Sequence, residues 1–235
     1  MTNIYLSPSK QPANTYIVGN TNEKAQMEAV SELVRQCLER DYECAAHLAT
    51  LTLGVAKGER PTEAKNKNCG VYIALHSNAA GSAGKATTAA GAIGFYHPSS
   101  DKSRALAKAI ADELDRVCPI PSNRSQNTAS GMAPFDGQGY GEVRSPWQLG
   151  IVPTLIEINF HDNPRTAQYI LDNHGKIAQA IADGTAKALG LLPRQASAAP
   201  AAAEVRVLCG GEEDARNVAQ AMTLLGYESQ VCQNV

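Results

Sequence analysis

The sequence has no apolar run long enough to span a bilayer, and its amino terminus lacks the basic and apolar segments of a signal peptide. We therefore expect a soluble protein that is made without a signal peptide. The 21 Lys and Arg residues do not outnumber the 23 Asp and Glu residues, which excludes the basic footprint of a nucleic-acid binder. No C-x-x-C pair is present, so the six cysteines predict reduced thiols rather than a zinc or redox motif.

What is present is enough for a sizeable core, because 43% of the 235 residues are hydrophobic. Short apolar runs alternate with segments of helical periodicity, which predicts an α/β sheet covered by helices on both faces. The expected strands cover residues 3–6, 44–48, 71–76, 92–96 and 151–160. The expected helices cover residues 27–38, 100–117 and 167–189, with a polar helix or loop at 61–68.

Composition also divides the chain. Residues 119–147 are rich in Pro, Gly, Ser and Asn and predict a substrate-binding or lid loop, because so long a connector is unusual in a compact domain. The Ala/Pro-rich stretch 193–203 predicts a linker between a catalytic domain, 1–192, and a small unit at 204–235. That unit shows a strand-helix-strand (β-α-β) pattern and is too short to bury much of a core, so we expect it to need a partner surface.

Two polar residues are expected near the carboxyl ends of strands, where α/β sheets bind ligands. His76 ends one apolar run, and Glu157 lies inside another that is followed by a histidine. Ligands of α/β proteins bind outside the carboxyl ends of the strands, and an unpaired buried carboxylate is costly. The alternative explanations are that His76 is a histidine with its hydrogen bonds satisfied in the core and that Glu157 belongs to a structural ion pair. Two such residues at the ends of two strands favour a functional site.

The order of four motifs resembles zinc-dependent N-acetylmuramoyl-L-alanine amidases of the Amidase_3 type, over about residues 3–190. The motifs are a first strand with a proline-containing turn, Glu23 before Lys24, LHSNA at 75–79 and PTLIEINFHDN at 153–163. The resemblance implies a mixed, mostly parallel sheet and cleavage of the bond between N-acetylmuramic acid and L-alanine in peptidoglycan. It also implies that Glu23 and His76 bind zinc and that Glu157 is the catalytic carboxylate. Read from the sequence alone, Glu23 also fits a capping box with Asn20.

The chain departs from this family at one ligand. The usual first histidine belongs to a turn after the first strand, and here residues 7–12 read SPSKQP. Lys10 is a poor ligand at neutral pH because its ammonium has no lone pair. We hypothesise that His161 replaces the histidine, since strand alternation puts it on the face of Glu157. His47, near the end of an expected strand, is the next candidate. Gln11 is weaker still, because zinc prefers imidazole, thiolate or carboxylate to an amide.

The resemblance predicts a hydrolase in which zinc activates a water and Glu157 carries its proton to the leaving nitrogen. Asn78 and Arg144 are candidate substrate contacts, although the first has a structural explanation as a strand end and the second as a solvated side chain. The alternative from another class is a metal-free peptidoglycan-binding protein that has lost catalysis together with the histidine. A third interpretation is another zinc peptidase or deacetylase on the same scaffold.

The tail resembles half of a SPOR-like peptidoglycan-binding repeat, and a dimerisation unit that makes a homodimer is an equal alternative. We expect the protein to act on the bacterial cell wall after release, as a phage endolysin, a sporulation protein or an autolysin.

Overall fold

The computed structural model describes residues 1–55, 58–194, 211, 213–215 and 218. The chain divides into one unit from Met1 to Arg194 and a second from Gln195 to Val235. In the second unit the described residues 213–215 are helical. Almost all of the predicted linker, and both strands of the predicted small unit, lie outside the described residues.

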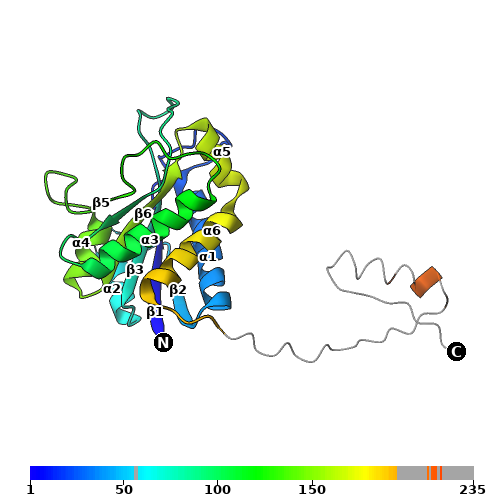
Figure 1. The fold of residues 1–235 in the computed structure, drawn as a ribbon, viewed down its shortest axis with the longest axis horizontal. Helices are drawn as coiled ribbons and strands as arrows, with labels where there is room; N and C mark the ends of the chain where they lie inside the picture. Colours follow the sequence, from blue (N-terminus) through cyan, green and yellow to red (C-terminus); the bar gives the residue numbers. More distant parts are fainter. Residues whose placement is uncertain (56–57, 195–210, 212, 216–217, 219–235) are drawn as a thin grey trace. The chain divides into compact units, whose positions relative to one another are not determined.

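The first unit is built on a six-stranded sheet with the order β2-β1-β3-β6-β4-β5 (Figure 1). Its neighbouring strands pair in parallel, except that β4 runs antiparallel to β6. The strands are β1 (Thr2–Pro8), β2 (Cys44–Leu48), β3 (Val71–Asn78), β4 (Ile93–Tyr96), β5 (Thr128–Ser130) and β6 (Val152–Phe160). The prediction of a mixed, mostly parallel sheet flanked by helices is confirmed.

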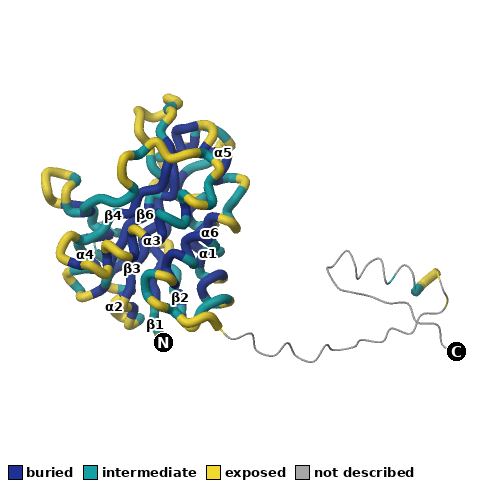
Figure 2. Tube along the Cα trace, in the orientation of Figure 1, coloured by how far each residue is buried: buried dark blue, intermediate teal, exposed yellow. Residues whose placement is uncertain are grey.

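Helices cover both faces of the sheet, and the strands bury side chains alternately against each layer. The helices are α1 (Glu23–Asp41), α2 (Glu59–Asn66), α3 (Asp101–Val117), α4 (Gly141–Gln148), α5 (Pro164–Asp172) and α6 (His174–Leu189). On one face Ile4 and Ile73 pack into a cluster with residues of α1, α3 and α6. On the other face Tyr5 and Tyr72 pack with residues of α2 and α4. Figure 2 shows the buried residues concentrated in the sheet between these layers.

Helix α1 begins two residues later than the predicted capping box requires. Asn22 is the N-cap, and its side chain accepts a hydrogen bond from the Ala25 backbone N–H at 3.0 Å. Asn20 instead adopts a left-handed conformation, with φ 46°. The capping box of Asn20 and Glu23 is therefore wrong. The Glu23 side chain is buried and available for another role.

Two other regions differ from the sequence prediction. Residues 119–147, expected to be irregular, contain β5 and all of α4 except its last residue. The predicted final helix region is two helices that meet at Asn173, and the first of them starts at Pro164 with Asn163 as its N-cap. Across the described residues, every helix is too short or too polar to cross a membrane.

Candidate active site

His76 and Glu157 lie side by side at the carboxyl ends of two central strands. They are register partners in the parallel pair β3 and β6. Side chains alternate between the faces of a strand, so both point to the face that also carries Tyr72 and Leu155, which is covered by α2 and α4. The sheet thus brings together the two residues that the sequence singled out.

The His76 ring is held between two buried carboxylates. Its Nδ1 lies 2.8 Å from Oε1 of Glu23, and its Nε2 lies 2.8 Å from Oε2 of Glu142. Burial of the ring lowers the pKa of His76, but the bonds to Glu142 and Glu23 outweigh it and raise that pKa well above its usual value. Burial likewise raises the pKa of each carboxyl, and the bonds to His76 reverse this, so both pKa values are lowered. In the absence of a metal, this arrangement favours an imidazolium between two carboxylates.

Glu142 is the site residue that sequence reasoning missed. It lies in the first turn of α4 and is fully surrounded, since its Oε1 also accepts hydrogen bonds from the hydroxyls of Ser7 and Tyr72. The guanidinium of Arg60 in turn donates to the Ser7 hydroxyl at 2.9 Å. This network fixes the Glu142 carboxylate against His76. The sequence offered only a weak signal, because α4 has two turns and contains Pro146.

Glu157 has an environment suited to proton transfer near neutral pH. Burial raises its pKa to about 7, and the neighbouring charge of His76 opposes that rise. Its buried Oε2 has no hydrogen-bond partner among the described residues. A carboxylate with such a pKa is divided between its charged and neutral forms at pH 7, as a general base requires.

The turn after β1 brings Gln11, rather than Lys10, to the site. The Gln11 Nε2 lies 3.3 Å from Nδ1 of His76, while Lys10 turns away and donates to the Thr52 carbonyl at 2.8 Å. Asn14 links this turn to the helix, because its Nδ2 donates to Glu23 at 2.6 Å and to the side-chain Oε1 of Gln11 at 3.1 Å. Gln11, which ranked below two histidines on chemical grounds, thus occupies the place beside His76 Nδ1.

His161 contacts a different part of the strand ends. Its Nδ1 lies 2.7 Å from the Ser77 carbonyl oxygen and 3.0 Å from the Ser77 hydroxyl, and its ring stacks on Tyr16. Among the described residues no hydrogen bond or ion pair joins His161 to Glu23, His76 or Glu157. Its role as third zinc ligand stays a prediction.

A register shift explains this placement. His76 pairs with Glu157, but Asn78 pairs with Phe160, so β6 contains one more residue than β3 between the two pairs. Such a bulge interrupts strict alternation. The expectation that strand alternation keeps residues 157 and 161 on one face does not hold through it.

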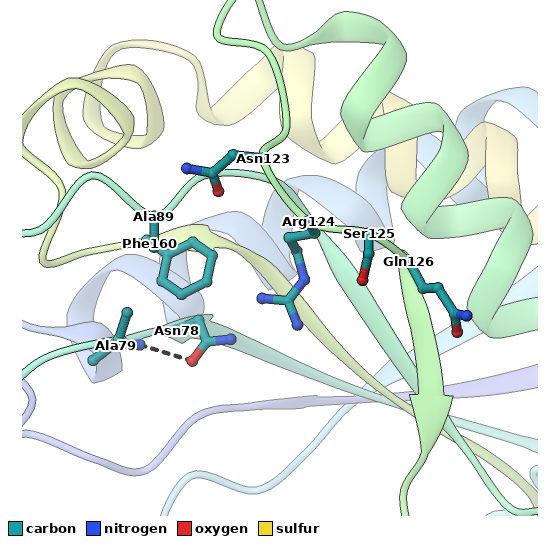
Figure 3. Close-up of a pocket in the computed structure, with 9 residues that line it drawn as sticks. Asn78, Ala79, Ala89, Asn123, Arg124, Ser125, Gln126 and Phe160 are labelled. Carbon is teal, nitrogen blue, oxygen red and sulfur yellow. Dashed lines mark hydrogen bonds between the residues drawn. The ribbon is translucent and has the colours of Figure 1, made fainter.

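The two predicted substrate contacts lie in different surroundings. Asn78 lines a cavity of about 490 Å³ at the ends of β3 and β6, and its Oδ1 accepts a hydrogen bond from the Ala79 N–H at 2.8 Å (Figure 3). Arg144 lies in α4, is not among the lining residues, and donates to the Gln138 carbonyl oxygen. Substrate binding by either residue stays a prediction.

The described residues include no group of three His, Cys, Asp or Glu side chains that could hold a metal ion. Glu23 and the His76 Nδ1 form a pair of conventional metal donors, with the Gln11 amide as their neighbour. Glu142 on the opposite ring nitrogen matches the carboxylate that commonly orients a metal-binding histidine. The arrangement can bind a cation at Nδ1 and place Glu157 beside it as a base.

Comparison with known proteins gives one family and a consistent set of folds. Residues 9–187 match the family model described as N-acetylmuramoyl-L-alanine amidase. No curated protein sequence matches the chain.

Several solved structures share the architecture. The catalytic domain of CwlV, an N-acetylmuramoyl-L-alanine amidase from Bacillus (Paenibacillus) polymyxa var. colistinus, is 18% identical with a TM-score of 0.63, over 82% of this chain and 100% of that one. The CwlD amidase from Clostridioides difficile, solved with the GerS lipoprotein, is 20% identical with a TM-score of 0.64, over 81% and 99%. The catalytic domain of the CD27L endolysin, which targets the same species, is 17% identical with a TM-score of 0.55, over 79% and 96%. These likenesses establish the fold.

Proposed function

This chain belongs to the N-acetylmuramoyl-L-alanine amidase family, and from that membership we propose that it hydrolyses the amide between N-acetylmuramic acid and the L-alanine of the peptidoglycan stem peptide. The observation that carries the proposal is the placement of His76 between Glu23 and Glu142, with Glu157 as its register partner. These side chains supply a histidine whose Nδ1 would bind a metal together with Glu23, and a base whose pKa of about 7 suits neutral pH.

Each residue of the site has a separate task in this reaction. Glu157 takes the proton of the attacking water and passes it to the leaving nitrogen, and its pKa of about 7 suits both transfers. In the neutral form of His76 that would bind a metal, Glu142 accepts the hydrogen of Nε2 and the Nδ1 lone pair is left for the metal. Ser7 and Tyr72 hold Glu142 in that position.

The donors fit zinc, the metal that the family implies. Ligand atoms about 2.0–2.1 Å from a tetrahedral zinc are separated from each other by roughly 3.3 Å. The Gln11 Nε2, whose place the amide oxygen would take if the amide turned over, lies 3.3 Å from His76 Nδ1, whereas Glu23 and His76 must separate slightly from 2.8 Å. The orphaned Oε2 of Glu157 adds negative charge that favours a cation nearby. When bound, zinc supplies a water of pKa near 7 and stabilises charge on the attacked carbonyl oxygen.

We assign the first two ligand positions to Glu23 and His76, and favour the Gln11 amide for the third. To use its oxygen, Gln11 must turn its amide over and give up the hydrogen bond from Asn14. The hypothesis that His161 fills the position is tested beside it. We expect Gln11→Ala to lower zinc content and His161→Ala to leave it unchanged, as measured by elemental analysis. The reverse result would transfer the third position to His161.

The catalytic role is tested with Glu157→Gln, which preserves shape and removes the base. We expect a loss of about 10²–10⁴-fold in turnover of a soluble muropeptide, since this is the usual contribution of a general base. Zinc content should equal that of the wild type, because Glu157 is not assigned as a ligand. A variant that retains wild-type turnover would refute the role.

A metal-free peptidoglycan-binding protein remains the second candidate, and one observation favours it. Glu23, His76 and Glu142 satisfy one another directly, so the cluster has a stable arrangement without a cation. A comparison with and without a chelator distinguishes the two candidate functions. A binding protein would retain peptidoglycan in a pull-down after chelation and release no peptide, whereas the amidase would lose hydrolysis on chelation and regain it with zinc.

The predictions for the tail and for the biological setting are carried forward as proposals. Residues 204–235 are proposed as a wall-binding or dimerising unit, and the protein is proposed to act on the cell wall after release. Removal of residues 193–235 should reduce retention on peptidoglycan in the first case and halve the solution mass of a dimer in the second.

A further inference from the structure

The cavity beside the catalytic residues is a polar space that the proposed mechanism does not use. It is lined from the strand ends by Asn78 and Phe160, which are register partners, and from the segment after α3 by residues 123–126. His76 and Glu157 lie two and three residues before these strand ends. The cavity therefore lies at the same end of the sheet as the site at which the amide would be cleaved, and its volume is about 490 Å³.

One cation dominates this cavity. Arg124 extends from its loop toward the strand ends, with Phe160 and Asn78 beside its guanidinium (Figure 3). The guanidinium carbon lies 5.5 Å from the centroid of the Phe160 ring, within the range of a cation–π contact that fixes the orientation of the group. Asn78, Asn123, Ser125 and Gln126 supply uncharged polar groups around it.

Arg124 has no acceptor of its own. Among the described residues none accepts a hydrogen bond from its guanidinium, its buried Nε is without a partner, and no ion pair involves it. Its charge acts on two acids without a hydrogen bond to either. It opposes the rise that burial causes in the pKa of Asp115, which accepts from the Ala92 N–H, and in the pKa of the buried Glu157. An arginine held in place with unused donors is suited to bind a carboxylate of a ligand.

The substrate of the proposed function has its free carboxylates on one side only. The two amino sugars are uncharged where the muramic carboxyl is tied up in the scissile amide, whereas the stem peptide carries free carboxylates. The nearest to the scissile bond belongs to the second residue of the stem, and this group is free in some peptidoglycans and amidated in others. Charge complementarity thus identifies which half of the substrate the cavity would receive.

We propose that Arg124 binds the free carboxylate of the second stem residue in this cavity, and so makes the protein selective for muropeptides in which that group is not amidated. The proposal rests on the proposed function and adds a specificity-determining residue to it. In this arrangement the peptide half of the substrate lies over Phe160 and Asn78, and the scissile amide lies toward His76 and Glu157.

Two muropeptides that differ only in a carboxylate or carboxamide at the second residue test the proposal. We expect the wild type to prefer the carboxylate form. In Arg124→Gln, kcat/KM for that form should fall about 10–100-fold through KM, as expected for loss of a hydrogen-bonded charge pair. The amidated form should change less than about threefold, and Arg124→Lys should recover part of the loss.

The matched control is Arg104→Gln, which removes an arginine that also lies over an aromatic ring, Tyr96, at 4.6 Å but is outside the cavity. It should leave both substrates unaffected. Equal losses for the two substrates in Arg124→Gln would overturn the proposal. A loss confined to kcat, with a shifted pH profile and an unchanged KM, would do so too, because Arg124 would then act only through its charge on Glu157.

Failure of the proposed function gives a separate outcome. If the wild type cleaves neither muropeptide, calorimetric titration of the same full-length proteins with the same two ligands decides the matter. Tighter binding of the carboxylate form that is lost in Arg124→Gln would support the carboxylate site without hydrolysis. Absence of any preference in the wild type would overturn it.

Discussion

At the scale of single residues, the catalytic task proposed for Glu157 comes with a cost in stability. Burial raises its pKa in the folded protein to about 7, above the ordinary value of 4.5. Between pH 4.5 and 7 the folded state therefore holds a proton that the unfolded state has released. The free energy of unfolding falls as the pH rises through that window, and above pH 7 the folded state carries the full penalty of a buried charge.

Because the raised pKa of Glu157 lowers the free energy of unfolding at high pH, it leads to a stability prediction for the metal-depleted protein. Glu157→Gln should raise the free energy of unfolding by up to about 3 kcal/mol at pH 8, and by close to nothing at pH 4, where the carboxyl is neutral in both states. Chemical denaturation in the presence of a chelator measures this. Glu113→Gln, which alters a carboxylate paired with the exposed Arg116, serves as control. Equal stability of Glu157→Gln and wild type at pH 8 would contradict the raised pKa.

Glu142 provides the second residue-scale prediction. It orients His76 without reaching the proposed ligand position, so Glu142→Gln should weaken zinc binding about 10–100-fold, the usual effect of altering such a partner. Competition with a chromogenic chelator measures the affinity. Glu63→Gln is the matched control, because Glu63 also accepts hydroxyl hydrogen bonds on this face, from Tyr5 and Thr50, and does not contact His76. Equal affinities of Glu142→Gln and wild type would remove Glu142 from the site.

At the scale of elements, the close approach of α3 and α6 depends on a glycine. A Cβ added at Gly184 would lie 2.6 Å from Cα of Ile110 and 2.7 Å from the Ala109 carbonyl oxygen, and backbone atoms cannot yield as a flexible side chain can. We expect Gly184→Ala to destabilise the protein by about 1–3 kcal/mol.

Gly175, in the first turn of the same helix, provides the control, since a Cβ there would meet nothing within 4 Å. Gly175→Ala should be neutral or stabilise by up to about 1 kcal/mol, because alanine favours the helix. Thermal unfolding of both variants measures the contrast. A neutral Gly184→Ala would show that the two helices separate easily.

The elements also explain which parts of the site could be predicted. His76 and Glu157 could be located because each belongs to an apolar strand, and parallel strands bring their carboxyl ends together. Glu142 could not, because a two-turn helix with an internal proline shows no recognisable period. The bulge that interrupts the alternation between residues 157 and 161 adds a single residue to β6, which leaves no trace in composition or hydropathy. Arg144 rather than Arg124 was selected because nothing in the sequence tells which arginine faces the cavity.

At the scale of the whole molecule, the site is assembled from four segments that are distant in sequence. Glu23 opens α1, His76 ends β3, Glu142 opens α4 and Glu157 lies in β6. They meet only when β3 and β6 pair, so the site forms with the first unit as a whole. The family match, residues 9–187, falls entirely within that unit, which ends at Arg194.

The most direct measurement is the mass of the products released from isolated peptidoglycan by the zinc-loaded protein. We predict stem peptides with a free L-alanine amino group, together with glycan strands whose lactyl carboxyl groups are free, and no such products with Glu157→Gln. Peptidoglycan that stays intact under zinc-loaded wild type, or products cut within the peptide or the glycan, would contradict an amidase.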